Sequence, residues 1–342
     1  MLLPTSKTFA SGDFPLSDGG HLPELTIAYE TYGTLAGDGG NAILLSHGYT
    51  SNPHAGGDAS GWWSDLIGPG KAMDTDRYFV ICANMLGSSY GSTGPASIDP
   101  ATGAPYGPDF PDITTGDMVA AQVRLLDHLG VGQLAAKIGF SYGGRLTFLW
   151  GVTHPDRMRA LVPVATGIDG RGRASSVQDL TDRFATCPGW NGGRYYGNEK
   201  DSGVYDMLVA MRIETLTNYG VAKHLEDTVD DPAERERRLR AQATQWAEEF
   251  DANSLIALRK ASIRFDATPQ AANIKAPLLY VLSRTDSLFP PDLGPKTVDL
   301  LTGHGVDASY FEIDSDYGHR GPSVDWPKWS DTLCDFLEAH AP

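Results

Sequence analysis

Short apolar runs alternate with longer stretches of helical periodicity along most of the chain. The apolar runs cover residues 42–46, 78–84, 135–140, 160–166, 277–283 and 309–315, and each is short enough for one strand. Strands that are apolar throughout and separated by helices are typical of a parallel sheet covered on both faces. Residues 25–33 alternate apolar and polar positions instead, which predicts a half-exposed strand in an antiparallel hairpin at the start of the sheet. The pattern predicts an α/β fold with a doubly wound, mainly parallel sheet.

The alternation stops between residues 167 and 276. This segment contains glycine-rich turns and helical stretches such as AERERRLRAQATQWAEEF, but no convincing strand pattern. An insertion between two core strands would lie over the carboxyl ends of the strands, where it can cover a site. We therefore predict a core formed by residues 1–166 and 277–342, with residues 167–276 inserted as a helical cap.

The charge balance narrows the classes of partner. The chain has 342 residues, and its 43 acidic and 27 basic side chains give a net charge of −16. Such a charge repels nucleic acids and anionic lipid surfaces, so we expect neither as a partner. A local basic cluster, ERERRLR at 234–240, alternates signs at helical spacing and is interpreted as a solvated helix face.

Cysteine usage and the first residues bear on the compartment. Cys82, Cys187 and Cys334 are widely spaced and odd in number, which supports neither a disulfide framework nor a zinc cluster. The opening MLLPTSKTF lacks the apolar region of a signal peptide, and no run has the length of a membrane span. We therefore expect a cytoplasmic protein. Nucleotide-binding and metal-binding motifs are missing as well, so we expect no metal and no resident cofactor.

Ser141 follows an apolar run and precedes a helical pattern, in the segment KIGFSYGGRL at 137–146. A tight turn from strand to helix leaves little room for side chains, so the flanking Gly139 and Gly143 suit it. In such a turn the hydroxyl stands at the edge of the sheet, close to the first amides of the helix. The segment therefore predicts that Ser141 is a nucleophile.

A nucleophilic serine needs a base, and the base needs an acid that orients it. Asp286 follows the apolar run 277–283, and His319 follows the run 309–315, in the acid-then-histidine order of the α/β-hydrolases. We predict Ser141, Asp286 and His319 as a catalytic triad. Asp314 and Asp316 are close to His319 in sequence and compete with Asp286, although aspartate at such positions is also typical of a turn.

An oxyanion formed during acyl transfer needs two N–H donors. We predict the amides of Tyr142, directly after the nucleophile, and of Tyr49, in the loop that follows the run 42–46. His47 in the same loop is interpreted as a structural anchor of that loop. Four tryptophans are candidates either for an acyl pocket or for the core: Trp62, Trp63, Trp190 and Trp246.

Several long motifs resemble the homoserine O-acetyltransferase-like branch of the α/β-hydrolases. The block from 61 to 119, CPGWNGGRYYG at 187–197, FDANS at 250–254 and EIDSDYGH at 312–319 carry the resemblance, which covers residues from about 20 to 335. It implies an α/β-hydrolase fold with a cap, and a ping-pong transfer of an acyl group from acetyl-CoA to a hydroxyl acceptor without metal. It also implies a homodimer joined through the cap helices.

Individual positions of this chain match the family's functional residues, but some positions expected to contact the acceptor carry other residues. Ser141, Asp286 and His319 match the family's triad, and Thr50 matches the threonine of its oxyanion-loop motif. Members usually have methionine where this chain has Tyr142. They also have aspartate directly after the catalytic histidine, where this chain has Arg320, a cation that repels a protonated amine. Arg212 is the candidate for the cap-helix arginine that pairs with the acceptor's carboxylate.

These observations leave three hypotheses. The first is a serine hydrolase that cleaves a small ester, thioester or related acyl compound through an ester on Ser141, because the triad is intact and the acceptor positions are altered. The alternative is an O-acyltransferase of the homoserine O-acetyltransferase type that uses acetyl-CoA. The third is a binding protein that keeps the fold without activity.

Overall fold

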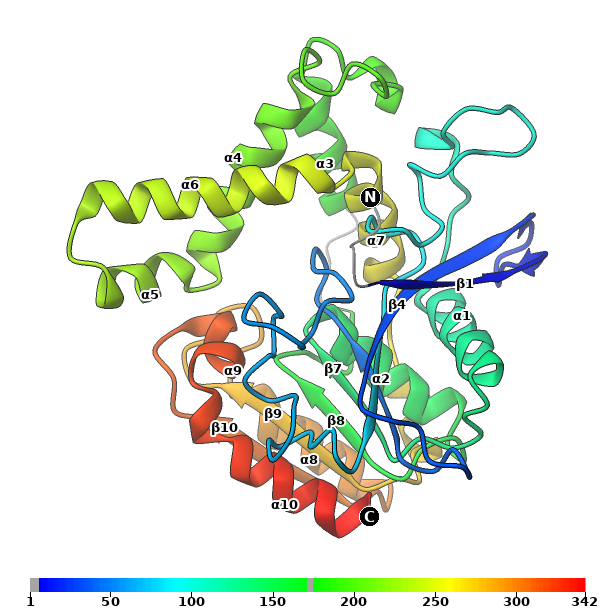
Figure 1. Cartoon of the computed structure of the whole chain (residues 1–342), viewed down its shortest axis with the longest axis vertical. Coiled ribbons are helices and arrows are strands. Elements are labelled where there is room, and N and C mark those ends of the chain that lie inside the picture. The colour runs from blue at the N-terminus through cyan, green and yellow to red at the C-terminus, as the bar shows by residue number, and fades with distance from the viewer. Residues whose placement is uncertain (1–5, 171–174, 342) are drawn as a thin grey trace.

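The computed structural model describes residues 6–170 and 175–341, and its centre is an eight-stranded sheet. The strands follow the order β1-β4-β6-β5-β7-β8-β9-β10 across the sheet (Figure 1). Their bounds are Lys7–Ser11 (β1), Leu25–Tyr32 (β4), Ala42–Ser46 (β5), Phe79–Ala83 (β6), Ala136–Phe140 (β7), Leu161–Val164 (β8), Leu278–Ser283 (β9) and Ala308–Ile313 (β10). A separate two-stranded sheet pairs β2 (Phe14–Pro15) with β3 (His21–Leu22). The six strands from β6 to β10 in this order are parallel, so the predicted α/β-hydrolase fold is confirmed.

The antiparallel pairing expected for residues 25–33 is confirmed, but this strand is more buried than the half-exposed one predicted. β4 pairs antiparallel with both β1 and β6, and most of its residues are buried. Leu25 and Ile27 face the core, while Glu30 on the other face accepts a hydrogen bond from His54. Glu30 is therefore a buried, hydrogen-bonded polar residue, whereas Thr26, Thr31 and Tyr32 remain partly exposed.

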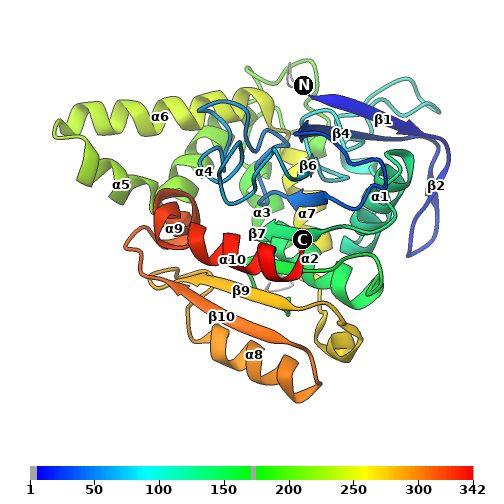
Figure 2. The same ribbon diagram turned by 60° about the horizontal axis from the view of Figure 1, so that its bottom comes forward.

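Helices cover the two faces of the sheet unequally. On one face lie α1 (Thr115–His128), α2 (Tyr142–Thr153) and α8 (Leu293–Gly303), which share a hydrophobic cluster with Leu44 and Ile81. α10 (Ser330–His340) lies on the other face of the sheet from α8 (Figure 2). Its Leu333 and Leu337 share a hydrophobic cluster with Ile43, Leu45 and Val80. Residues 47–78, between β5 and β6, form turns without a regular helix, and their Trp63, Leu66 and Met73 complete this second cluster.

The chain between β8 and β9 is helical. Its helices are α3 (Ser175–Ala185), α4 (Val204–Asn218), α5 (Val221–Thr228), α6 (Pro232–Glu249) and α7 (Ala252–Ile263). No strand is found in the described part of residues 167–276, and Figure 1 shows α4, α5 and α6 extending away from the sheet. We infer that this segment is the cap. The cluster ERERRLR lies on α6, where Glu234 pairs with Arg237 and Arg238 in a solvated face.

Within the described residues, no helix is both long and apolar enough to cross a membrane.

Candidate active site

Ser141 occupies a strained turn between β7 and α2. Its backbone has φ 55° and ψ −114°, outside the regions that non-glycine residues normally adopt. A Cβ on Gly139 would lie 2.1 Å from the carbonyl oxygen of Gly143, and one on Gly143 would lie 2.0 Å from that of Ser46. Only glycine fits at these two positions, because the backbones of β5, β7 and α2 approach one another so closely there.

A chain of hydrogen bonds joins the three residues of the predicted triad. His319 Nε2 lies 2.9 Å from Ser141 Oγ, and His319 Nδ1 lies 2.7 Å from Asp286 Oδ2. Ser141, Asp286 and His319 are all buried, and they follow the carboxyl ends of β7, β9 and β10. Parallel neighbouring strands bring these ends to one edge of the sheet, which explains how residues so distant in sequence meet.

Of the three aspartates considered, Asp286 is the one that contacts the histidine. Its second carboxylate oxygen, Oδ1, accepts the amides of Leu288 at 2.9 Å and Phe289 at 3.2 Å. Asp314 and Asp316 are exposed and pair with Arg284 instead, at 2.7 and 2.6 Å. Their side chains stabilise the loop after β10.

Tyr49 and Tyr142, whose amides are the predicted oxyanion donors, line one hollow together with Ser141. No acceptor for the amide of either residue is found within residues 6–170 and 175–341. Their side-chain rings are stacked, with centroids 5.8 Å apart and planes 6° from parallel. Both hydroxyls donate to carbonyls of α7, Tyr49 to Leu255 and Tyr142 to Leu258. The two tyrosines thus tie both oxyanion segments to the cap.

His47 is fully buried below the oxyanion loop. Its Nδ1 lies 2.8 Å from the carbonyl oxygen of Gly48, and its Nε2 lies 3.0 Å from Asn84 Oδ1. Burial lowers the pKa of His47 to about 4, so the ring is neutral at physiological pH. These contacts agree with its interpretation as an anchor of the loop.

Three adjoining hollows surround Ser141, and Tyr49 and Tyr219 line all of them. Their volumes are about 180, 230 and 70 Å³, which suits small acyl groups and small acceptors. Ser141 lines the first and the third. The sequence analysis missed Tyr219, although it lies seven positions after Arg212, which is two helical turns along one face. It also missed Arg145 and Arg259, which line the first hollow.

Comparisons with known proteins agree with this geometry. Residues 41–321 match the family model of the alpha/beta hydrolase fold. Homoserine O-acetyltransferase of Moorella thermoacetica is 38% identical over 357 residues, covering 96% of this chain and 94% of the relative. The chain belongs to the homoserine O-acetyltransferase family. It is therefore an acyl-transfer enzyme of the alpha/beta hydrolase fold, which excludes the inactive binding protein as a hypothesis.

Two solved structures place this family member among both transferases and esterases. The homoserine O-acetyltransferase from Bacillus anthracis superposes with a TM-score of 0.86 at 28% identity, covering 98% of each chain. The structure of esterase E22 superposes with a TM-score of 0.87 at 27% identity, covering 97% of this chain and 99% of that one. The same fold therefore carries both activities.

The residues predicted to bind substrate lie near the serine of this homoserine O-acetyltransferase family member. Arg212 on α4 and Arg320 after His319 both line the 70 Å³ hollow, together with Ser141 and Thr50. Arg212 Nη1 donates to Thr50 Oγ1 at 2.8 Å, and its guanidinium lies 5.0 Å from the ring centroid of Trp246. Thr50 thus contacts the arginine, and through it the cap.

The four tryptophans divide between the two roles considered for them. Trp62 lines the 70 Å³ hollow and Trp246 the 230 Å³ hollow. Trp63 packs against Trp329 in the second hydrophobic cluster, and Trp190 is buried in the cap beside Phe184.

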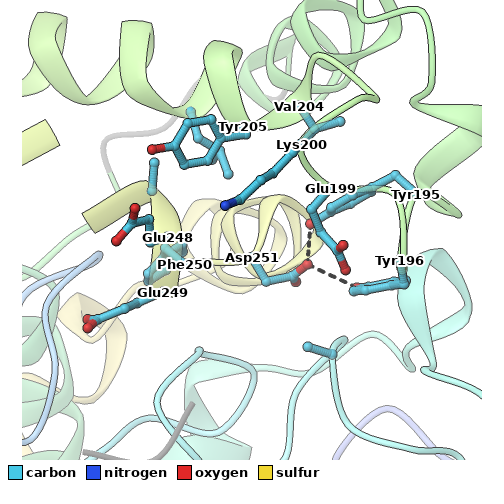
Figure 3. A pocket seen from close by; sticks show the side chains of 13 residues that line it. Tyr195, Tyr196, Glu199, Lys200, Val204, Tyr205, Glu248, Glu249, Phe250 and Asp251 are labelled. Atoms are coloured by element: carbon cyan, nitrogen blue, oxygen red, sulfur yellow. Dashed lines mark hydrogen bonds between the residues drawn. The ribbon is translucent and has the colours of Figure 1, made fainter. Parts of the chain in front are cut away.

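A larger hollow of about 610 Å³ lies elsewhere, between the α6–α7 junction and residues 195–205 (Figure 3). Its lining does not include the triad. Asp251 accepts hydrogen bonds from Tyr195 and Tyr196 there, and its other oxygen accepts the amide of Ser254 as the N-cap of α7. The polar groups of the FDANS and CPGWNGGRYYG motifs therefore join parts of the cap to one another.

Proposed function

We propose that this enzyme is an O-acyltransferase that moves a small acyl group from a thioester to a hydroxyl acceptor through an ester on Ser141. The observation that carries the proposal is the buried chain of hydrogen bonds from Asp286 through His319 to Ser141. The curated relatives, homoserine O-acetyltransferases at 36–38% identity, support transfer over the hydrolysis that the sequence analysis placed first.

In the first half-reaction, His319 Nε2 takes the proton of Ser141 Oγ while that oxygen attacks the thioester carbonyl. The amides of Tyr49 and Tyr142 bind the oxyanion of the tetrahedral intermediate. Asp286 holds His319 Nδ1–H and stabilises the imidazolium that forms. The C–S bond then breaks, and the leaving thiolate takes the proton from His319.

In the second half-reaction, the acceptor hydroxyl takes the place of the thiol. His319 removes its proton as the oxygen attacks the ester carbonyl, and returns the proton to Ser141 Oγ as the C–O bond to the serine breaks. Acetyl-CoA, which the resemblance implies, is a co-substrate in this scheme. No metal or resident cofactor takes part in these steps.

The test follows the acyl group by mass spectrometry. After incubation with acetyl-CoA alone, we expect the mass of the chain to increase by one acetyl group on the peptide that contains Ser141. Ser141→Ala removes the label, whereas Ser175→Ala, at an exposed position on α3, keeps it. An unlabelled wild-type chain that also releases no CoA would refute the proposal.

Hydrolysis is the second candidate, and a specific residue favours it. Arg320 stands where a family member that accepts an amino acid has aspartate, and esterase E22 shares the fold. Water and an acceptor compete for the same ester on Ser141, so the two functions differ in the fraction of this ester that reacts with each. If acceptors leave the rate of free acid formation unchanged, hydrolysis is the function. If added acceptors divert the acyl group into a new ester, acyl transfer is the function.

We also propose the homodimer through the cap helices that the resemblance implies. Small-molecule acyl compounds are the substrates of this family, and the cap stands over the site that would hold them.

A further inference from the structure

The hollows around Ser141 are cationic although the whole chain is acidic. Arg145, Arg212, Arg259 and Arg320 line them, in a chain whose net charge is −16. The linings of the two hollows that contain Ser141 include no aspartate or glutamate. Local charge of this sign, opposite to that of the molecule, indicates a site for an anionic compound.

Arg212 and Arg320 converge on the smallest hollow from different parts of the fold. Arg212 belongs to α4 of the cap, and Arg320 follows the catalytic histidine in the core. Within the part of the chain that the structure describes, neither guanidinium forms an ion pair, and Arg212 Nε is buried without a hydrogen-bond partner. Burial and then the charge of Arg212 lower the pKa of Arg320, which reflects two like charges facing one cavity.

The hollow has room for a small group. Its volume of about 70 Å³ suits a carboxylate and little more, and guanidinium groups match the geometry of carboxylates. A protonated amine in the same place would meet two cations and no carboxylate. A small anion therefore complements the positive charge of the hollow, whereas an ammonium group would be repelled by it.

We propose that Arg320, together with Arg212, binds a carboxylate of a small substrate that carries no ammonium group. This inference rests on the proposed function and deepens it, since it names the substrate class. The carboxylate can arrive on the acceptor, as in a hydroxy acid, or on the acyl group, as in the half-thioester of a dicarboxylic acid. In either case Arg320 is a specificity residue beside the reacting carbonyl.

The acceptor arm compares three alcohols on the acetylated wild-type enzyme. 4-Hydroxybutyrate is homoserine without its amine, and 1-propanol is 4-hydroxybutyrate without its carboxylate. If the carboxylate belongs to the acceptor, we expect kcat/KM for 4-hydroxybutyrate to exceed that for both others by about tenfold or more. The acyl arm compares 4-nitrophenyl hydrogen succinate with 4-nitrophenyl butyrate, and a similar preference for the succinate ester would identify the acyl group as the source.

Variants of Arg320 separate a binding role from a structural one. Arg320→Leu should remove the preference mainly through KM, while the neutral 1-propanol and butyrate ester change less than about threefold. Arg320→Asp should invert the order of 4-hydroxybutyrate and homoserine. Arg240→Leu, an equal charge change at an exposed position on α6, should leave every ratio as in the wild type.

The outcomes distinguish the two levels of the proposal. A burst of 4-nitrophenol from wild type that disappears in Ser141→Ala supports the acyl-enzyme regardless of what Arg320 binds. If that burst is present, three results would overturn the carboxylate inference alone. They are equal use of charged and neutral substrates, a preference for homoserine, and an equal loss for all substrates in Arg320→Leu. Absence of the burst and of any label on Ser141 would overturn the function and the inference together.

Discussion

The replacement Asp286→Asn tests the hydrogen-bond chain at its deepest point. Asp286 Oδ1 accepts the amides of Leu288 and Phe289, while Oδ2 faces His319 Nδ1 at 2.7 Å. In the variant one of these oxygens becomes an NH₂ group. The remaining oxygen should stay with the two backbone amides, because turning it away would leave two buried N–H groups without acceptors. The NH₂ group then faces His319 Nδ1.

The tautomer of His319 decides the size of the effect. An NH₂ donor opposite Nδ1 favours the ring with its proton on Nε2, and that nitrogen then cannot accept the proton of Ser141. Restoring the reactive tautomer places two donors face to face in a buried site, where an unsatisfied group costs about 1–3 kcal/mol. The negative charge that stabilises the imidazolium is lost as well. Triads respond to this change with a loss of about 10⁴-fold in kcat, or roughly 5 kcal/mol in the barrier.

The assay is the pre-steady-state burst of 4-nitrophenol from 4-nitrophenyl acetate, with thermal unfolding followed by circular dichroism to check the fold. Asp314→Asn is the matched control, because Asp314 is exposed and pairs with Arg284 rather than with the histidine. We expect this control to stay within about twofold of wild type. The reasoning is refuted if Asp286→Asn keeps more than about a tenth of the burst rate, or if Asp314→Asn loses as much.

Three further predictions concern stability and assembly. Burial lowers the pKa of Lys137 to about 7, so above that pH the unfolded chain binds more protons than the folded one. The free energy of unfolding of the wild type, measured in urea, should therefore rise by about 2 kcal/mol between pH 7 and 9. Lys137→Met should not show this rise. An equal gain in the variant would contradict this. Gly143→Ala should cost at least about 1–3 kcal/mol and most activity, because its Cβ would lie 2.0 Å from the carbonyl oxygen of Ser46. Gly132→Ala, with no atom within 4 Å of its Cβ, should change neither quantity. Light scattering should give twice the 36.8 kDa of one chain, and a monomer at all concentrations would exclude the dimer.

Much of the core follows from the sequence because its signals are local. Each parallel strand is a short apolar run, and the carboxyl ends of such strands meet at one edge, so Ser141, Asp286 and His319 could be placed together from order alone. The alternation over residues 25–33 predicts the antiparallel strand but overstates its exposure. Glu30 is buried because it pairs with His54, and a single sequence does not distinguish a solvated side chain from one with a distant partner.

The walls of the site were less predictable because they depend on packing between distant segments. Arg259 lies on α7 and lines the site because this helix packs against Tyr49 and Tyr142, whose hydroxyls donate to its carbonyls. Tyr142 departs from the family's methionine, and its hydroxyl contact with Leu258 gives this departure a structural role. Such contacts become visible only once the cap is placed on the core.

Core and cap contribute different residues to the site, and this difference explains how one fold can support both transfer and hydrolysis. In the proposed mechanism the core supplies the nucleophile, the base and the oxyanion donors, which would form the acyl-enzyme in either reaction. The fate of that ester depends on whether an acceptor or water occupies the space beside it. Arg320 belongs to the core and Arg212 to the cap, and both line one hollow of about 70 Å³ next to Ser141. An anion bound by both would displace water from this hollow and join cap to core while its hydroxyl attacks. If the carboxylate belongs to the acceptor, the same two arginines set the choice of acceptor, and removing either charge should lower the share of acyl groups that reach 4-hydroxybutyrate rather than water, measured as ester against free acid by mass spectrometry.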